Sequence, residues 1–103
     1  MVIPLTEPVI NDEMKREMIK VFEGKLFLRG KPVEDFENDF AKYIGVKYAV
    51  AVNSGMSAIL LSLLSMSIGE GDKVITTPAI FISTVNAITL AGAEPVFADI
   101  NMH

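Results

Sequence analysis

The sequence predicts an α/β fold in which two helices precede a β-α-β-α-β segment with parallel strands. Two apolar stripes at helical spacing lie within residues 1–46, and three short β-rich runs alternate with two apolar helical runs over residues 47–103. A strand–helix–strand order is typical of parallel sheets, because a parallel pair needs a long crossover connection. We therefore expect one partial domain over residues 1–103, with a helical N-terminal segment at 1–46 and the start of an α/β domain at 47–103.

Two amphipathic helices are predicted in the N-terminal segment. Asn11 suits the cap of the first helix and Gly24 its end, whereas Pro32 suits the first turn of the second helix and Gly45 its end. The apolar faces comprise Met14, Met18, Val21 and Phe22 in the first helix and Val33, Phe36, Phe40 and Tyr43 in the second. We interpret both faces as packing surfaces.

Three strands and two further helices are predicted in the remainder of the chain. The expected strands are residues 48–52, 73–77 and 94–98, and the expected helices run from about Gly55 to Ile68 and from about Phe81 to Ala91. Gly69 and Gly92 follow the two helices and suit their ends. The first of these strands, residues 48–52, is a continuous apolar run, which is typical of a strand that is covered on both faces.

The composition argues against several classes of function. The net charge is −4, whereas nucleic acid is usually bound by a basic face. The chain has no cysteine, so neither a disulfide nor a thiolate metal site is possible. The single histidine, His103, is the last residue, which removes the usual metal ligand and general base from any internal site. We expect no metal site and no nucleic-acid partner.

Two uncharged stretches, residues 48–69 and 74–93, are about as long as a membrane-spanning helix. Asn53-Ser54-Gly55 interrupts the first and Thr76-Thr77-Pro78 the second, which leaves helical runs of about 12 residues that are too short to span. No basic stretch follows Met1, so no secretory signal is evident. We expect buried elements of an α/β domain in the cytoplasm, with no membrane partner.

The first predicted strand runs directly into a helix through small polar residues. Ligands of open α/β sheets bind beyond the carboxyl ends of the strands. Ser54 suits the helix cap, and Gly55 would let an anion approach the amides of Gly55, Met56 and Ser57 at the positive end of the helix. The spacing alone favours a phosphate site and an ordinary capped helix equally. The lysine of a P-loop and the three glycines of a dinucleotide fingerprint are absent.

The second predicted strand ends in the same way at a candidate ligand site. Pro78 ends the strand, and Phe81 stands near the start of the next helix. An aromatic ring in that place can stack on a flat heteroaromatic ligand. Taken alone, Phe81 is more often a core residue, but a neighbouring phosphate site favours the stacking role.

Several short motifs together resemble the DegT/StrS family of sugar aminotransferases. The motifs are Phe36-Glu37, Phe40-Ala41, Asn53-Ser54-Gly55, Gly69-Glu70-Gly71-Asp72-Lys73-Val74-Ile75, Thr77-Pro78, Phe81, Thr84, Asn86-Ala87-Ile88 and Gly92-Ala93-Glu94-Pro95-Val96-Phe97. Each is weak alone, but their order and spacing are specific and run from about Ile3 to Asp99. The resemblance implies the N-terminal part of the large domain of a fold-type-I aminotransferase.

The resemblance also implies a cofactor and its site. Members of the family bind pyridoxal 5′-phosphate (PLP) and transfer an amino group, usually from glutamate, to a keto-sugar carried on a nucleotide. By position, the backbone around Gly55, Met56 and Ser57 would hold the cofactor phosphate, and Phe81 would stack on the pyridine ring. Met56 stands where the family usually has threonine, which removes one hydroxyl contact. The family further implies a homodimer that acts in polysaccharide or amino-sugar biosynthesis.

No catalytic residue is predicted within the 103 residues. The family's aspartate for the pyridine nitrogen and its cofactor-anchoring lysine lie beyond residue 103, so we expect an N-terminal segment that is inactive alone. Lys73 begins a strand, at the end opposite the proposed site, and we interpret it as a solvated charge. Asp99 follows a strand at the ligand end and resembles a family acidic position, but it is not assigned a catalytic role.

Two alternatives remain open at this level. The chain could belong to a sugar dehydratase of the same family, in which histidine replaces the lysine. It could also be a non-catalytic phosphate-binding or interaction module, which an open reading frame ending at His103 would favour. The residue at the lysine position separates the two enzymes.

Overall fold

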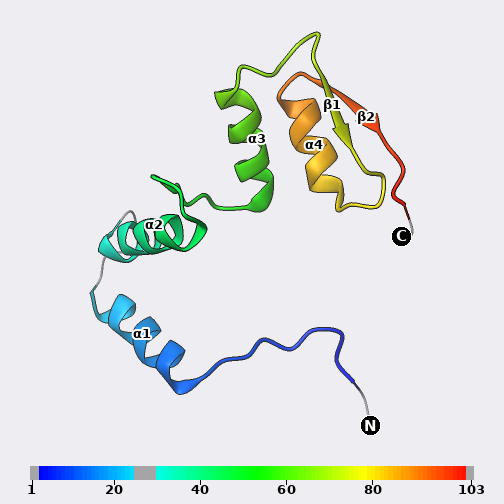
Figure 1. Cartoon of the computed structure of the whole chain (residues 1–103). Coiled ribbons are helices and arrows are strands. Elements are labelled where there is room, and N and C mark those ends of the chain that lie inside the picture. Colours follow the sequence, from blue (N-terminus) through cyan, green and yellow to red (C-terminus); the bar gives the residue numbers. More distant parts are fainter. Residues whose placement is uncertain (1–2, 25–29, 102–103) are drawn as a thin grey trace. The chain divides into compact units, whose positions relative to one another are not determined.

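The computed structural model describes residues 3–24 and 30–101. The chain divides into two compact units, Met1–Ala51 and Val52–His103, and each is described by itself. In chain order, helices α1 and α2 belong to the first unit, and α3, β1, α4 and β2 belong to the second (Figure 1).

Helix α1 (Asp12–Glu23) has the boundaries that its capping residues predict. The side chain of Asn11 accepts a hydrogen bond from the amide of Met14 at 2.8 Å, and Gly24 follows the last turn. The acidic residues of the first turn and Lys20 in the last turn complement the helix dipole. None of the residues of α1 is buried, so its apolar face is not covered.

Helix α2 (Lys31–Ile44) also follows its sequence signals, with Pro32 in the first turn and Gly45 in the left-handed conformation at the end. The rings of Phe36 and Phe40 stack on its apolar face, with centroids 5.6 Å apart. The amides of both Gly45 and Val46 donate to the carbonyl of Ala41, so the chain turns back at the helix end. Ala41 is the one buried residue of α2.

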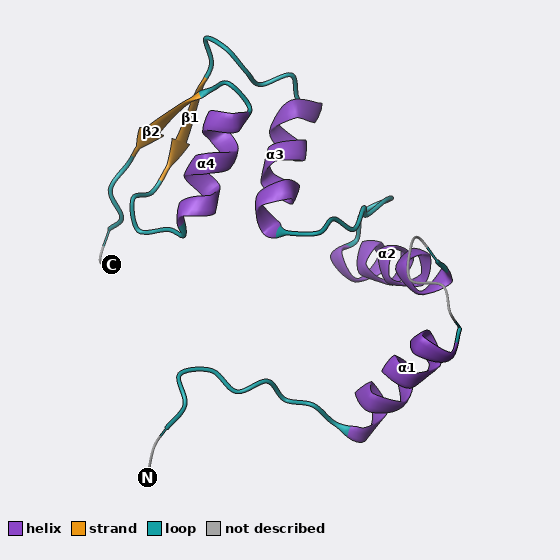
Figure 2. Cartoon of the chain, turned by 180° about the vertical axis from the view of Figure 1, so that it is seen from behind, coloured by secondary structure: helices purple, strands orange, loops and turns teal. Residues whose placement is uncertain are grey.

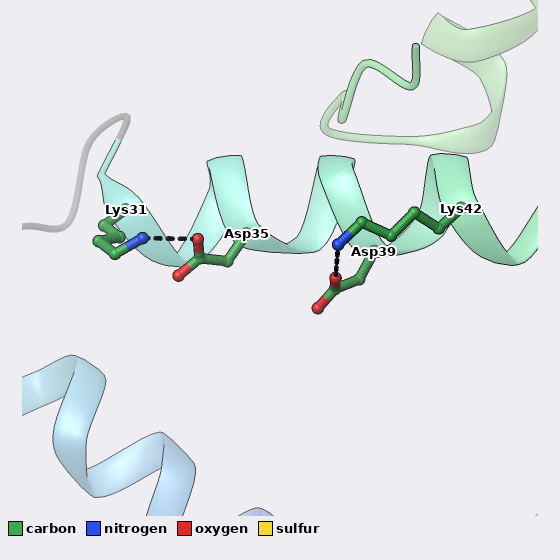
Figure 3. A network of polar contacts seen from close by, with 4 residues as sticks. All are labelled: Lys31, Asp35, Asp39 and Lys42. Carbon is green, nitrogen blue, oxygen red and sulfur yellow. Dashed lines mark hydrogen bonds and ion pairs between the residues drawn. The ribbon is translucent and has the colours of Figure 1, made fainter. Parts of the chain in front are cut away.

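Two exposed ion pairs lie on α2, Lys31–Asp35 at 2.7 Å and Lys42–Asp39 at 3.1 Å (Figure 3). The hydrogen bond with Asp35, together with its negative charge, raises the pKa of Lys31. Exposed pairs of this spacing stabilise a helix only slightly, because water screens the attraction. We assign both pairs to helix support.

The second unit contains a parallel pair of strands, β1 (Lys73–Thr76) and β2 (Glu94–Phe97). Helix α4 (Ile82–Leu90) connects them and contacts β2, and helix α3 (Gly55–Ser65) packs against α4. Figures 1 and 2 both place α4 between α3 and the strands. This arrangement gives the second unit helices on one face of a two-stranded sheet.

The core of the second unit lies between the two helices and the sheet. Ile88 in α4 is 1% exposed and is the largest fully buried side chain of the described residues. The other buried members of this cluster are Leu63, Ala91 and Ala93, against which Ile59, Leu60, Ile68 and Val74 pack. Small residues around α4 let the helix approach its neighbours closely.

The predicted order of elements is confirmed except for the first strand. Residues 48–52 form no strand, because a strand needs a hydrogen-bonded neighbour and the strands of the described residues pair only with each other. Helix α3 ends at Ser65, three residues before the predicted Ile68, and Ser67 adopts a left-handed conformation with φ of 59°. The other helix and strand ends lie within one residue of their predicted positions.

We predict that the 103-residue chain on its own associates rather than folding as a compact monomer. Apolar side chains on both faces of the sheet are open to solvent: Ile75 is 74% exposed on one face, and Phe97, in register with Thr76, is 55% exposed on the other. Unpaired strand edges and large apolar patches promote association. Sedimentation of the purified chain should therefore show oligomers. A compact monomer with a cooperative thermal transition would contradict the prediction.

Candidate functional site

The candidate site lies at the end of the second unit where helices begin and strands finish. The amino ends of α3 and α4 and the carboxyl ends of β1 and β2 share this end in both views (Figures 1 and 2). The hydrogen bond from the amide of Ala98 to the carbonyl of Thr76, at 2.8 Å, extends the strand pair there. In an open α/β sheet this end is the one that binds ligands.

A closed hydrogen-bond network fixes the start of α3. The amide of Ser57 donates to Ser54 Oγ at 3.1 Å, and Ser57 Oγ donates to Asn53 Oδ1 at 2.7 Å. The hydroxyls of Ser54 and Ser57 lie 3.0 Å apart. The hydroxyl of Ser57 has one proton and donates it to Asn53, so Ser54 is the donor in the contact between the two hydroxyls. The amide and the hydroxyl of Ser57 thus both donate hydrogen bonds within the chain.

Two amides of the helix start remain available to a ligand. The backbone N–H groups of Gly55 and Met56 have no acceptor among the described residues, as expected for a first helical turn. A Cβ added at Gly55 would meet nothing within 4 Å, and its φ lies outside the left-handed region. The backbone therefore does not require glycine here. What glycine provides is open space in front of the amides, where an anion can approach.

Phe81 stands at the cap position of α4, at the same end of the unit. Its φ and ψ of −65° and 134° are extended, and the amide of Thr84 donates to its carbonyl at 3.1 Å. The side chain is 77% exposed. Phe81 is therefore not a core residue of this unit, and its ring is accessible to a ligand.

The charged candidates differ in position. Lys73 starts β1 at the end away from the site and pairs with Glu94 at 3.4 Å, with both side chains exposed. Asp99 is exposed and follows β2 at the site end, where it accepts a hydrogen bond from the amide of Ile100. Residues 3–24 and 30–101 contain no group of His, Cys, Asp or Glu side chains that could hold a metal ion.

Two polar contacts were not predicted from the sequence. Asn53 holds the hydroxyl of Ser57, and Glu37 accepts a hydrogen bond from the amide of Ala51 at 2.7 Å. The only signal for either was membership in a short motif, Asn53-Ser54-Gly55 or Phe36-Glu37. Neither motif indicates by itself which backbone group its side chain reaches.

The chain belongs to the DegT/DnrJ/EryC1/StrS aminotransferase family, which it matches over residues 8–103. It is 44% identical over 99 residues to the spore coat polysaccharide biosynthesis protein SpsC of Bacillus subtilis, covering 96% of this chain and 25% of SpsC. The chain thus spans about a quarter of the length of the curated relative it matches.

Solved structures of the family have the same fold over this region. One is PseC of Helicobacter pylori, an aminotransferase involved in the biosynthesis of pseudoaminic acid, with 34% identity, a TM-score of 0.87 and coverage of 95% of this chain and 27% of PseC. A GDP-4-keto-6-deoxymannose-3-dehydratase with a trapped PLP-glutamate geminal diamine gives 30% identity, the same TM-score and the same coverages. The family depends on PLP. None of the described helices is long and apolar enough to cross a membrane.

The residues of the candidate site fit a phosphorylated aromatic cofactor. The open approach at Gly55 and the two available amides suit a phosphate, and the accessible ring of Phe81 suits a flat heterocycle. Met56 adds no hydroxyl, and Ser57 can add one only if Asn53 releases it. The cradle is therefore built mainly from backbone donors.

We predict that Phe81→Ala, made in the full-length enzyme, weakens PLP binding by about 1–3 kcal/mol, the scale of losing one stacking aromatic. The reason is the accessible ring at the start of α4. Equilibrium dialysis of the variant against PLP measures the change. Phe36→Ala removes an exposed ring from the other unit and serves as the control. An unchanged PLP affinity in Phe81→Ala would exclude the stacking role.

We predict that Gly55→Val weakens the binding of a phosphate-bearing ligand by about tenfold or more, since two amide hydrogen bonds are obstructed. Ala58→Val in the same helix is the matched control for the cost of a β-branched residue, because Ala58 does not line the open amides. Titration with inorganic phosphate and with PLP measures the effect. If Gly55→Val and Ala58→Val weakened phosphate and PLP binding equally, the proposal that the amides of Gly55 and Met56 bind the phosphate would be contradicted.

Proposed function

We propose that this chain supplies the cofactor-binding part of a sugar aminotransferase, with residues 47–103 forming the start of that domain. The single observation that carries the proposal is the presence of an open phosphate cradle and an accessible aromatic ring at one end of one sheet. A phosphate-binding loop alone has many uses. An accessible phenylalanine ring at the same end of the unit adds a surface on which a flat heterocycle can stack.

Each residue of the site has a distinct part in the proposed binding. The amides of Gly55 and Met56 and the dipole of α3 bind the phosphate group and so orient the cofactor. Ser57 and Ser54 hold the start of the helix in shape through the network with Asn53. Phe81 covers one face of the pyridine ring and excludes water from it. When bound, PLP supplies an electron sink for the chemistry at the amino-bearing carbon.

The substrate proposal rests on the named relatives. SpsC is a spore coat polysaccharide biosynthesis protein, and PseC is an aminotransferase involved in the biosynthesis of pseudoaminic acid. We therefore propose a nucleotide-linked keto-sugar as acceptor, within polysaccharide or amino-sugar biosynthesis. Glutamate is the proposed amino donor, supported by the PLP-glutamate adduct named for the dehydratase structure. We further propose a homodimer located in the cytoplasm.

A specific observation supports a sugar dehydratase as the second candidate function. The dehydratase is as similar in fold as PseC, with the same TM-score over the same share of the chain. The residues described here are expected to bind the cofactor in both enzymes. Reading the coding sequence past codon 103 separates them: lysine at the anchoring position supports the aminotransferase, histidine supports the dehydratase, and an immediate stop codon supports a non-catalytic module.

We predict that the 103-residue chain alone does not transfer an amino group. By the resemblance to the family, none of the residues of this chain corresponds to the anchoring lysine. Lys73 lies at the end of β1 that is away from the candidate site. The purified chain, supplied with PLP, glutamate and a keto-sugar nucleotide, should release no 2-oxoglutarate above a protein-free control. Measurable glutamate-dependent turnover would overturn this prediction.

A further inference from the structure

The hydroxyl of Ser57 donates its proton to a side chain rather than to the backbone. Its Oγ lies 2.7 Å from Asn53 Oδ1, although serine hydroxyls within helices often bond the carbonyl of the preceding turn. Ser62 in the same helix makes that backbone contact, since its hydroxyl donates to the carbonyl of Ala58 at 2.7 Å. Asn53 is exposed, so water can replace Ser57 as the partner of its amide oxygen. The hydroxyl of Ser57 is therefore a donor that the chain can release.

Release of this donor leaves the cap of α3 intact. Ser54 Oγ accepts a hydrogen bond from the amide of Ser57 at 3.1 Å, and the hydroxyl of Ser54 donates to Ser57 Oγ at 3.0 Å. Neither contact uses the hydroxyl proton of Ser57. Rotation about the Cβ–Oγ bond of Ser57 redirects that proton while the oxygen stays in place. Only the hydrogen bond to Asn53 is given up.

An anion at the proposed cradle is a better acceptor for this proton than Asn53. The Oδ1 of Asn53 is a neutral amide oxygen, whereas a hydrogen bond to an ionised acceptor is roughly twice as strong. Ser57 Oγ lies 3.0 Å from the hydroxyl of Ser54, and Ser54 directly precedes the open amide of Gly55. The hydroxyl of Ser57 thus stands beside the two available amides of the cradle as a third donor, and in the unliganded chain Asn53 occupies it.

We propose that Ser57 redirects its hydroxyl proton from Asn53 to a bound phosphate, so that Asn53 is a competing acceptor that lowers phosphate affinity. The inference rests on the proposed cofactor site and adds Asn53 to it as a positioning residue that acts through Ser57. On binding, the chain exchanges an exposed neutral hydrogen bond for one to a charged acceptor. A ligand without a phosphate leaves the contact between Asn53 and Ser57 in place.

Two ligands of the full-length enzyme freed of cofactor test the proposal, pyridoxamine 5′-phosphate and pyridoxamine, which differ only in the phosphate. Ring fluorescence measures both affinities. We expect Asn53→Ala to strengthen pyridoxamine 5′-phosphate binding by about two- to tenfold, because the competing bond no longer has to be broken. Ser57→Ala should weaken it by about fivefold, because the difference between the bond to the anion and the bond to Asn53 is lost. Adding Asn53→Ala to Ser57→Ala should change nothing further, and the affinity for pyridoxamine should be the same in all variants.

Ser62→Ala is the matched control, since it removes a hydroxyl of the same helix that donates to a backbone carbonyl. It should leave both affinities unchanged. A gain of phosphate affinity in Asn53→Ala cannot arise from poor folding, so an unchanged or weaker affinity there would overturn the proposal. A gain that persisted without the Ser57 hydroxyl, no loss in Ser57→Ala, or equal changes for both ligands would overturn it as well. Equal affinities of the unmodified enzyme for the two ligands would instead refute the proposed phosphate site.

Discussion

The parallel pairing of β1 and β2 is the constraint on which the rest of the second unit depends. Two adjacent parallel strands cannot be joined by a tight turn, so the chain must return through α4. The return places the start of α4 at the carboxyl end of β1. Helix α3 runs in the same direction as α4, and its start is brought to the same end (Figure 1). A site made from helix starts therefore follows from strand polarity.

Under the proposed function, the start of α3 is both a capped helix end and a phosphate site, and these two uses compete for the same hydrogen-bond donors. Ser54 accepts a hydrogen bond from the amide of Ser57 and so caps α3, and Asn53 accepts a hydrogen bond from the hydroxyl of Ser57. Capping stabilises a helix by about 1 kcal/mol, so this network has a structural value of its own. The donors left over are the amides of Gly55 and Met56, so in the proposed site the open approach at Gly55 matters more than the side chain at position 56.

The small amount of buried apolar surface limits how much of the described chain is stabilised by packing. Ile88 and three smaller or comparable neighbours form the buried cluster, while residues on α1, α2 and the outer face of the sheet remain exposed. The burial of apolar surface is the main force that stabilises a fold. The second unit owes its shape to a small core and to the strand pair. The segment 48–52 has neither and is held by one carboxylate.

The sequence by itself determined the local elements and the family. Asn11, Pro32, Gly45 and Ser54 act on neighbouring backbone groups, so their effects are readable from adjacent residues, and the predicted helix starts agree with the structure. The order of strand and helix also implied parallel strands. The motifs for the family are likewise contiguous in the chain.

Only the tertiary structure decided which distant groups meet. Residues 48–52 read as a strand because they are apolar, yet a strand exists only where another chain segment pairs with it. The exposure of Phe81 depends on which surfaces pack around the start of α4, which its own neighbours in sequence do not specify. The partner of Glu37 depends on the turn at Gly45 that brings Ala51 back to the helix. Contacts between distant positions are set by the path of the whole chain, and short sequence patterns carry no record of that path.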